Sequence, residues 1–118
     1  MIKFRAWLKD ENRYIIVGCI DWAKECVQEI NGISWYGFDS IILEQFTGAY
    51  DKNGKEIYIG DIIELIDRYI YVEWNEFLYM HDVRFLRYKE DRDRNYVFGG
   101  VKFKELREYE VIGNIHEL

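Results

Sequence analysis

Two histidines are the side chains in this sequence best suited to general acid and base catalysis, and each has an acidic neighbour. Asp82 follows His81 and Glu117 follows His116. A carboxylate can orient an imidazole for proton transfer. Adjacent residues on a strand point to opposite faces, however, so each pair would need a turn to meet. The spacing therefore does not predict an oriented base.

Covalent and phosphate chemistry are equally poorly supported. The chain has three hydroxyl nucleophiles outside tyrosine, and none lies in the strand-turn-helix elbow of a serine hydrolase: Ser34, Ser40 and Thr47. The pair Gly99-Gly100 lacks the Lys-Ser or Lys-Thr that follows in a phosphate-binding loop. We expect no catalytic residues, no cofactor and no enzymatic activity.

Two short acidic runs resemble the start of a calcium loop. After Asp51, that loop would need an oxygen ligand and then Gly where this chain has Lys55 and Glu56. The run from Asp91 to Asn95 supplies three ligand positions, but Tyr96 replaces the required Gly. We therefore interpret the first run as a hairpin turn and expect no calcium site in the second.

Cys19 and Cys26 are the two cysteines of the chain. A zinc site would need His81 and His116 as further ligands, at separations unlike the short paired spacings of structural zinc sites. Free cysteines are often buried as small hydrophobic residues. We expect no metal site and two buried thiols.

Basic and aromatic residues alternate in the segment from residue 84 to residue 94, a combination that could contact phosphates and stack on bases. Its five basic residues are offset by three acidic ones, which leaves a charge of +2. We expect these charges to pair internally on a solvated strand pair or long loop. The basic residues are Arg84, Arg87, Lys89, Arg92 and Arg94.

Alternation in the segment from Tyr69 to Trp74 places Ile70, Val72 and Trp74 on one face, which we expect to be the core face. Tyr69, Tyr71 and Glu73 then lie on the opposite face, and the two tyrosines are its aromatic members. They are the better candidates for a partner-binding surface.

Composition predicts a folded, mainly β protein that should fold without a partner. Of 118 residues, 18% are aromatic and none is proline, and aromatic side chains suit strands. The net charge of −6 disfavours binding to nucleic acid, which needs clustered Lys and Arg. No apolar stretch approaches the ~20 residues of a membrane span. We expect a cytoplasmic protein without membrane association.

The first 40 residues predict a hairpin followed by a helix. Alternation over residues 2–8 and an apolar run over residues 14–20 predict two paired strands. Asp21 is a suitable N-cap for a helix from Trp22 to Ile30, which Asn31-Gly32 would end. Residues 33–38 fit either a strand or a packed loop.

Residues 41–118 predict a second region of short strands. Asn53-Gly54 and Gly60-Asp61 mark turns between apolar runs. One helical turn over residues 103–107 would precede a last strand over residues 111–115. This order is typical of a small closed SH3-like β-barrel. We expect one compact unit in which the region 1–40, with its hairpin and helix, packs on the barrel region 41–118.

Three stretches together resemble the YopX family of phage and prophage proteins of Gram-positive bacteria. They are IKFRAW at residues 2–7, QFTGAYDKNGKEIYIGDII at residues 45–63 and EVIGNIHEL at residues 110–118. Their order and placement match that family over the full length. The resemblance implies a phage-encoded cytosolic protein with an SH3-like β portion and self-association. It brings no activity and no site residues.

These observations favour a phage accessory protein that binds protein, either its own copies or a host or phage protein. Two alternatives remain open. One is a small barrel that binds nucleic acid through the segment from Arg84 to Arg94. The other is an acidic decoy that uses the charge of −6 to occupy a host DNA-binding protein.

Overall fold

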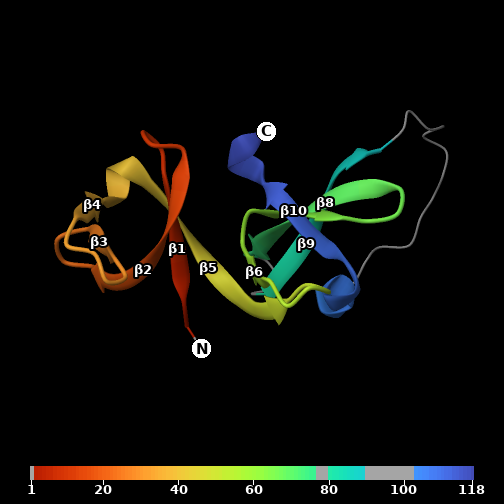
Figure 1. Ribbon diagram of the computed structural model, residues 1–118, viewed down its shortest axis with the longest axis horizontal. Coiled ribbons are helices and arrows are strands. Elements are labelled where there is room, and N and C mark those ends of the chain that lie inside the picture. The colour runs from red at the N-terminus through yellow and green to blue at the C-terminus, as the bar shows by residue number, and fades with distance from the viewer. Residues whose placement is uncertain (1, 77–79, 90–102) are drawn as a thin grey trace. The chain divides into compact units, whose positions relative to one another are not determined.

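The computed structural model describes residues 2–76, 80–89 and 103–118, which are mainly β-structure (Figure 1). The mainly β prediction is confirmed. The strands form two antiparallel sheets, with the orders β4-β3-β2-β1-β5-β6 and β10-β7-β8-β9. Internal contacts divide the chain into two compact units, residues 1–46 and 47–118. Strand β5 (Ile41–Tyr50) runs from one unit into the next.

The strands of the described residues do not close into a barrel, so the prediction of a closed barrel was wrong. Strand β6 (Glu56–Tyr58) ends the first sheet, whereas β7 (Asp61–Glu64) belongs to the second. Between them Gly60 has a φ of +92°, and the amide of Tyr58 donates to the Asp61 carboxylate at 2.8 Å. This tight corner takes the chain out of one ladder and into another, so the ladder does not continue into a barrel.

In the first unit, β1 (Phe4–Leu8) pairs with β2 (Arg13–Asp21), which confirms the predicted hairpin. On its other side β1 pairs with β5, from Leu8 opposite Ile41 to Phe4 opposite Gln45. Alternate inward side chains then form a small core. Its buried members are Ala6, Leu8, Ile15, Val27 and Ile41.

The predicted helix from Trp22 to Ile30 is wrong, because the chain forms a β-hairpin there. The Asp21 carboxylate accepts from the amide of Lys24 at 2.9 Å, which closes a turn, and Glu25 has a φ of +53°. Strand β3 (Cys26–Glu29) then pairs with β2. Trp22, placed on the apolar stripe of the expected helix, is 65% exposed.

The undecided segment 33–38 contains a strand, β4 (Trp35–Gly37), followed by the short 3₁₀ helix η1 (Phe38–Ser40). Asn31 takes the expected left-handed conformation with a φ of +59°, but in the turn between β3 and β4.

The prediction of two buried cysteines is also wrong, since Cys19 is exposed and Cys26 is half-buried. Pairing of Cys19 with Gln28 and of Asp21 with Cys26 places both thiols on the sheet face opposite the Val27 side chain.

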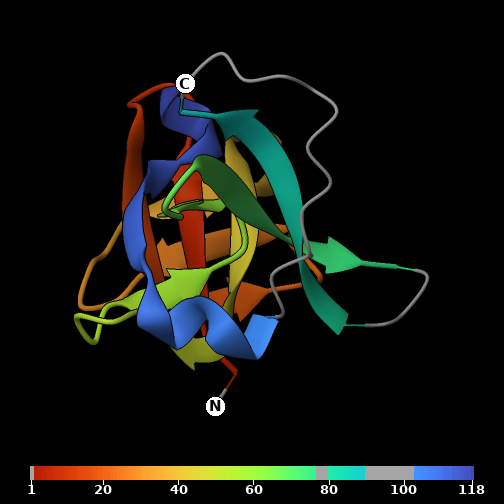
Figure 2. The same cartoon turned by 90° about the vertical axis from the view of Figure 1, so that its right-hand side faces the viewer.

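In the second unit, β7 pairs with β8 (Arg68–Asn75), β8 pairs with β9 (Met80–Tyr88), and β10 (Glu110–Asn114) pairs with β7. Figure 2 shows β8 in green and β9 in teal, and η2 in blue. The 3₁₀ helix η2 (Phe103–Glu108) confirms the predicted helical turn, and β10 confirms the last strand. The core is formed by Ile57, Ile63, Leu65, Ile70, Val72, Leu106 and Val111.

The predicted turn after β5 is present, and its first residue binds two distant parts of the unit together. Asp51 Oδ1 accepts from the amides of Asn53 at 2.8 Å and Lys55 at 2.9 Å. Its Oδ2 accepts from the amide of Val111 in β10 at 3.0 Å. Gly54 supplies the positive φ, +79°, that the turn requires. One carboxylate therefore closes the hairpin and attaches the last strand.

A buried ion pair lies between β1 and β5 of the first unit. Arg5 Nε donates to Glu44 Oε1 at 3.0 Å, and Tyr14 Oη donates to the same oxygen at 2.7 Å. The guanidinium of Arg5 also lies 3.9 Å from the ring centroid of Tyr14. Arg5 is 8% exposed and Glu44 is 3% exposed. Removing one partner would leave a charge away from water.

Replacing Asp51 by asparagine should destabilise the second unit by about 2 kcal/mol at neutral pH, because the amide group cannot accept all three bonds. Burial alone would raise the pKa of Asp51, but the amides of Val111, Lys55 and Asn53 and the Lys55 charge outweigh it and hold that pKa below the ordinary value. The contribution is therefore complete above about pH 4 and is lost as the pH falls through the lowered pKa. Urea unfolding of wild type and Asp51→Asn from pH 7 to pH 2.5 measures this contribution to the free energy of unfolding.

The difference in unfolding free energy between wild type and Asp51→Asn should shrink over the acid part of that range. Asp10→Asn, at an exposed position, is the matched control. A difference that stayed constant down to pH 2.5 would contradict the role assigned to the Asp51 carboxylate.

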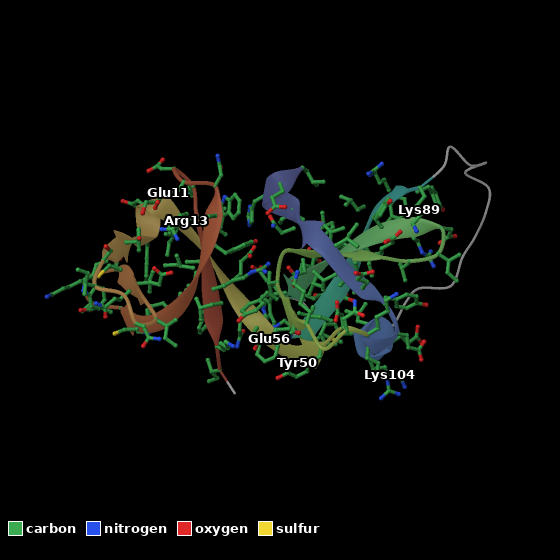
Figure 3. The ribbon with its side chains drawn as sticks, in the orientation of Figure 1. Glu11, Arg13, Tyr50, Glu56, Lys89 and Lys104 are labelled. Carbon is green, nitrogen blue, oxygen red and sulfur yellow. The ribbon has the colours of Figure 1, made fainter. Side chains whose placement is uncertain are left out.

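Glu44→Gln should destabilise the first unit by about 3 kcal/mol, because it removes the countercharge of a buried guanidinium. The control is Glu11→Gln. Arg13 Nε lies 3.3 Å from Glu11 Oε1, and both side chains of this pair, labelled in Figure 3, are exposed. That change should have no measurable effect. Thermal unfolding followed by circular dichroism compares the two. Equal melting temperatures for both variants would show that the buried pair is not stabilising.

Candidate partner surface

Strands β8 and β9 bring most of the predicted partner-surface residues together. Tyr69 lies opposite Arg87 and Tyr71 lies opposite Arg84, all on one face of the sheet. Lys89 follows β9, and its ammonium lies 5.6 Å from the Tyr69 ring centroid. The remaining two candidates, Arg92 and Arg94, lie outside the described residues. We call this surface the β8–β9 face.

A β-bulge allows Arg84 and Arg87 to share this face. Residues three apart in a regular strand point to opposite sides. Here the register shifts, so that Tyr69 pairs with Arg87 but Ile70 pairs with Phe85, which leaves Leu86 as the extra residue. The Tyr69 and Tyr71 side chains lie opposite the buried Ile70 and Val72, as their alternation predicts. Trp74, expected on the core face with them, is 41% exposed, so its predicted burial is wrong.

Carboxylates pair with two of the cations on the β8–β9 face. Arg84 forms an ion pair with Glu73 of β8. The Lys89 ammonium, labelled in Figure 3, lies 2.6 Å from Glu64 Oε1 of β7. The hydrogen bond and charge of Glu73 raise the pKa of Arg84, so this group stays charged. Both carboxylates lie outside the segment from residue 84 to residue 94, so these two ion pairs are not the pairing within that segment that the sequence predicts.

Arg87 makes a different contact on the same face. Its guanidinium lies 4.8 Å from the ring centroid of Tyr69, within the range of a cation–π interaction. This face carries three cations, Arg84, Arg87 and Lys89, and three carboxylates, two of which form the ion pairs with Arg84 and Lys89. The carboxylates are Glu64, Glu73 and Asp82, the last placed opposite Glu73 by the strand register. These described side chains therefore carry no net charge.

Alternation places Glu73 on the face of Tyr69 and Tyr71, but the sequence argument did not pair it with Arg84 and did not place Glu64 or Asp82 there, because it counted charges along one segment. Glu64 lies 25 residues before Lys89, and Glu73 lies 11 residues before Arg84. No local pattern connects Glu64 to Lys89.

His81 and Asp82 lie on opposite faces of β9. Asp82 is paired with Glu73, whereas His81 is paired with Trp74. The His81 ring lies 5.2 Å from the Trp74 centroid and 6.0 Å from that of Phe103. Burial lowers the pKa of His81, so the ring is neutral at pH 7. The arrangement holds a histidine between aromatic rings, away from the adjacent carboxylate.

Two of the three hydroxyl candidates bond to the backbone. Thr47 Oγ1 donates to the carbonyl of Ile57 at 2.6 Å, and Ser40 Oγ donates to the carbonyl of Gly37 at 2.8 Å. In the described ranges, no three His, Cys, Asp or Glu side chains are grouped to hold a metal ion. The same ranges contain no helix with the length and apolarity to cross a membrane.

Comparison with known proteins gives a family and a structural neighbour. The family model described as "YopX protein" matches residues 3–118. The chain is similar to the crystal structure of protein EF1440 from Enterococcus faecalis, with 25% identity and a TM-score of 0.64. That match covers 99% of this chain and 94% of the other. A comparison with curated proteins finds no match. On the family match, which spans nearly all of its residues, the chain belongs to the YopX family.

Proposed function

We propose that this chain is a non-enzymatic phage accessory protein that acts in the host cytosol by binding protein. The observation that supports it is the β8–β9 face, where two tyrosines and two arginines lie on adjacent paired strands. Tyrosine and arginine are enriched among the residues that dominate protein interfaces. Its partner is a second copy of the chain or a host or phage protein.

The charge balance of the β8–β9 face favours a protein partner over nucleic acid. Affinity for DNA or RNA depends on cations that neutralise phosphates and release counterions. Arg84 and Lys89 already have carboxylate partners, and the whole chain carries −6. A nucleic acid would have to displace Glu73 and Glu64. A protein surface with its own mixed charges could instead pack against the pairs as they are.

Ordering of these side chains lowers the entropic cost of binding. Arg87 rests on the Tyr69 ring, and Lys89 bonds to Glu64 and also lies near that ring. A long flexible side chain that is already held in place loses less freedom when a partner binds. Tyr69 is central to this arrangement, since both cations contact it. Arg87 has no carboxylate partner among the described contacts.

Charge reversal at Arg87 should weaken association, because it places a carboxylate at the centre of the face and removes the cation from Tyr69. We expect wild-type chain to form dimers or larger oligomers, or to retain a protein from infected cells. Arg87→Glu should reduce either affinity at least about tenfold. Size-exclusion chromatography with light scattering, across a concentration series, measures the first. Quantitative co-purification measures the second.

Arg107→Glu in η2 makes the same charge change at an exposed position in the same unit and should leave both affinities unchanged. A wild-type chain that stays monomeric at every concentration and retains no protein would contradict the proposed function. Equal losses for Arg87→Glu and Arg107→Glu would show that the β8–β9 face is not the binding surface.

Nucleic acid should bind weakly or not at all. Fluorescence anisotropy with labelled single-stranded and double-stranded DNA and RNA, at 50 and 200 mM salt, tests this expectation. Tight binding that falls steeply with salt and is lost in Arg87→Glu would instead support a nucleic-acid module.

A further inference from the structure

Within the described part of the chain, strand β4 is an open edge of the six-stranded sheet, at the end opposite β6. It pairs with β3 on one side: Trp35 lies opposite Gln28, Tyr36 opposite Val27 and Gly37 opposite Cys26. In Figure 1 it is the outermost orange strand, beside β3. An edge strand leaves half of its backbone groups without a strand partner. It can therefore accept an added strand.

The register identifies which backbone groups point outward. The amide of Phe38 donates to the carbonyl of Glu25 at 2.8 Å, which makes these opposite residues a hydrogen-bonded pair. Such pairs alternate with non-bonded pairs along an antiparallel ladder. Tyr36 therefore bonds to Val27, whereas the backbone groups of Trp35 and Gly37 point away from β3. The Gly37 carbonyl already accepts from Ser40 Oγ at 2.8 Å, so the groups that can meet a docking strand are the N–H and C=O of Trp35 and the N–H of Gly37. Trp35 and Gly37 are two residues apart, which is the spacing of the hydrogen-bonded residues along an antiparallel strand pair.

Side chains beside this edge leave room for a partner and expose apolar area to it. A Cβ built on Gly37 would have nothing within 4 Å. Three apolar side chains in and around β4 are exposed: Ile33 at 91%, Trp22 at 65% and Trp35 at 46%. A pocket of about 350 Å³ lies on the sheet face that carries the Trp35 side chain. It is lined by Asp21, Lys24, Cys26 and Trp35.

Charge selects the partner. From residue 21 to residue 39, which includes β3, β4 and their turns, the chain has four acidic residues and one basic residue, a net charge of −3. The acidic residues are Asp21, Glu25, Glu29 and Asp39. Arg13 of β2 lies near Tyr36 and Glu29 but is paired with Glu11, and the Lys9 ammonium donates to the Asp39 carbonyl, so these neighbours reduce the charge to −2. Pairing of two copies edge to edge would bring two such charges together. A segment that carries lysine or arginine would be attracted, and its cation could lie over the exposed Trp35 indole.

We infer that the β4 edge binds an extended basic peptide as an added β-strand. The N–H and C=O of Trp35 and the N–H of Gly37 supply the main-chain bonds, and Asp21 and Trp35 select a lysine or arginine side chain. This site lies in the first unit and does not depend on the β8–β9 face. A negative result for peptide binding at β4 would therefore leave the proposed function of the β8–β9 face untouched, and the reverse also holds.

Two substitutions at Gly37 separate the backbone bond from all other contributions. Its φ of −69° and ψ of 149° are the angles that proline prefers, and its N–H points outward. Gly37→Pro should fold normally but lose one docking donor. Gly37→Ala keeps the donor and meets no neighbouring atom. The pair is therefore matched for side-chain addition.

The probe is a blocked seven-residue peptide of alternating valine and arginine, titrated into the full-length chain and followed by amide chemical shifts. Shifts should centre on Trp35, Gly37 and the Trp35 indole. Affinity should fall at least about fivefold in Gly37→Pro, the value of one net hydrogen bond, and less than about twofold in Gly37→Ala. A peptide with glutamate in place of arginine should not bind.

Two N-methylated peptides test strand addition without changing the protein. One is methylated at its odd-numbered amides and the other at its even-numbered amides, so that only one of them keeps the donors that face β4. One should bind and the other should not. Equal binding of both, or equal binding to wild type and Gly37→Pro, would overturn the inference.

Three further results would also overturn it. These are absence of binding by the arginine peptide, shifts confined to β8 and β9, and equal affinity for the glutamate peptide. A fourth concerns a second copy of the chain. Concentration-dependent shifts at Trp35 and Gly37 without peptide would show that self-pairing occupies the edge.

Discussion

The second unit depends on one buried carboxylate. Asp51 is 5% exposed, and its two oxygens accept three backbone amides, from Asn53, Lys55 and Val111. The last of these lies 60 residues away in sequence. Because β10 pairs with β7, and β7 with β8, this contact fixes one edge of the sheet that carries the β8–β9 face. Residues far from the partner surface thus determine whether that surface has a stable support.

Several residues in the stretches that resemble the YopX family have structural roles of this kind. Besides Asp51, Asp61 is 1% exposed and accepts from the amide of Tyr58. Gly60 donates to the carbonyl of Val72 at 2.8 Å and accepts from the amide of Ile115 at 2.9 Å. The motif residues therefore specify corners and attachments between strands. The resemblance therefore predicts architecture.

The two proposed surfaces recognise partners through different groups. The β8–β9 face presents side chains whose charges balance and whose positions are fixed by Tyr69. The β4 edge presents backbone groups and an acidic neighbourhood. Side-chain surfaces select by shape and charge pattern, whereas an edge strand binds any extended segment whose side chains suit its pockets. One chain could therefore contact two partners of different chemistry.

The sequence by itself determined the mainly β class, the N-terminal hairpin, the turn after Asp51, and the helical turn before the last strand. Each depends on period-two alternation or on local turn chemistry, such as the positive φ of Gly54. Tertiary structure alone decided three other features: β3 where a helix was expected, the open sheets, and the common face of Arg84 and Arg87. All three depend on strand pairing. Strand β3 forms because Val27 pairs with Ile20 of β2, the sheets stay open because the chain turns at Gly60, and Arg84 and Arg87 share a face because of the bulge at Leu86. Pairing energies come from residues far apart in the chain, which no local pattern specifies.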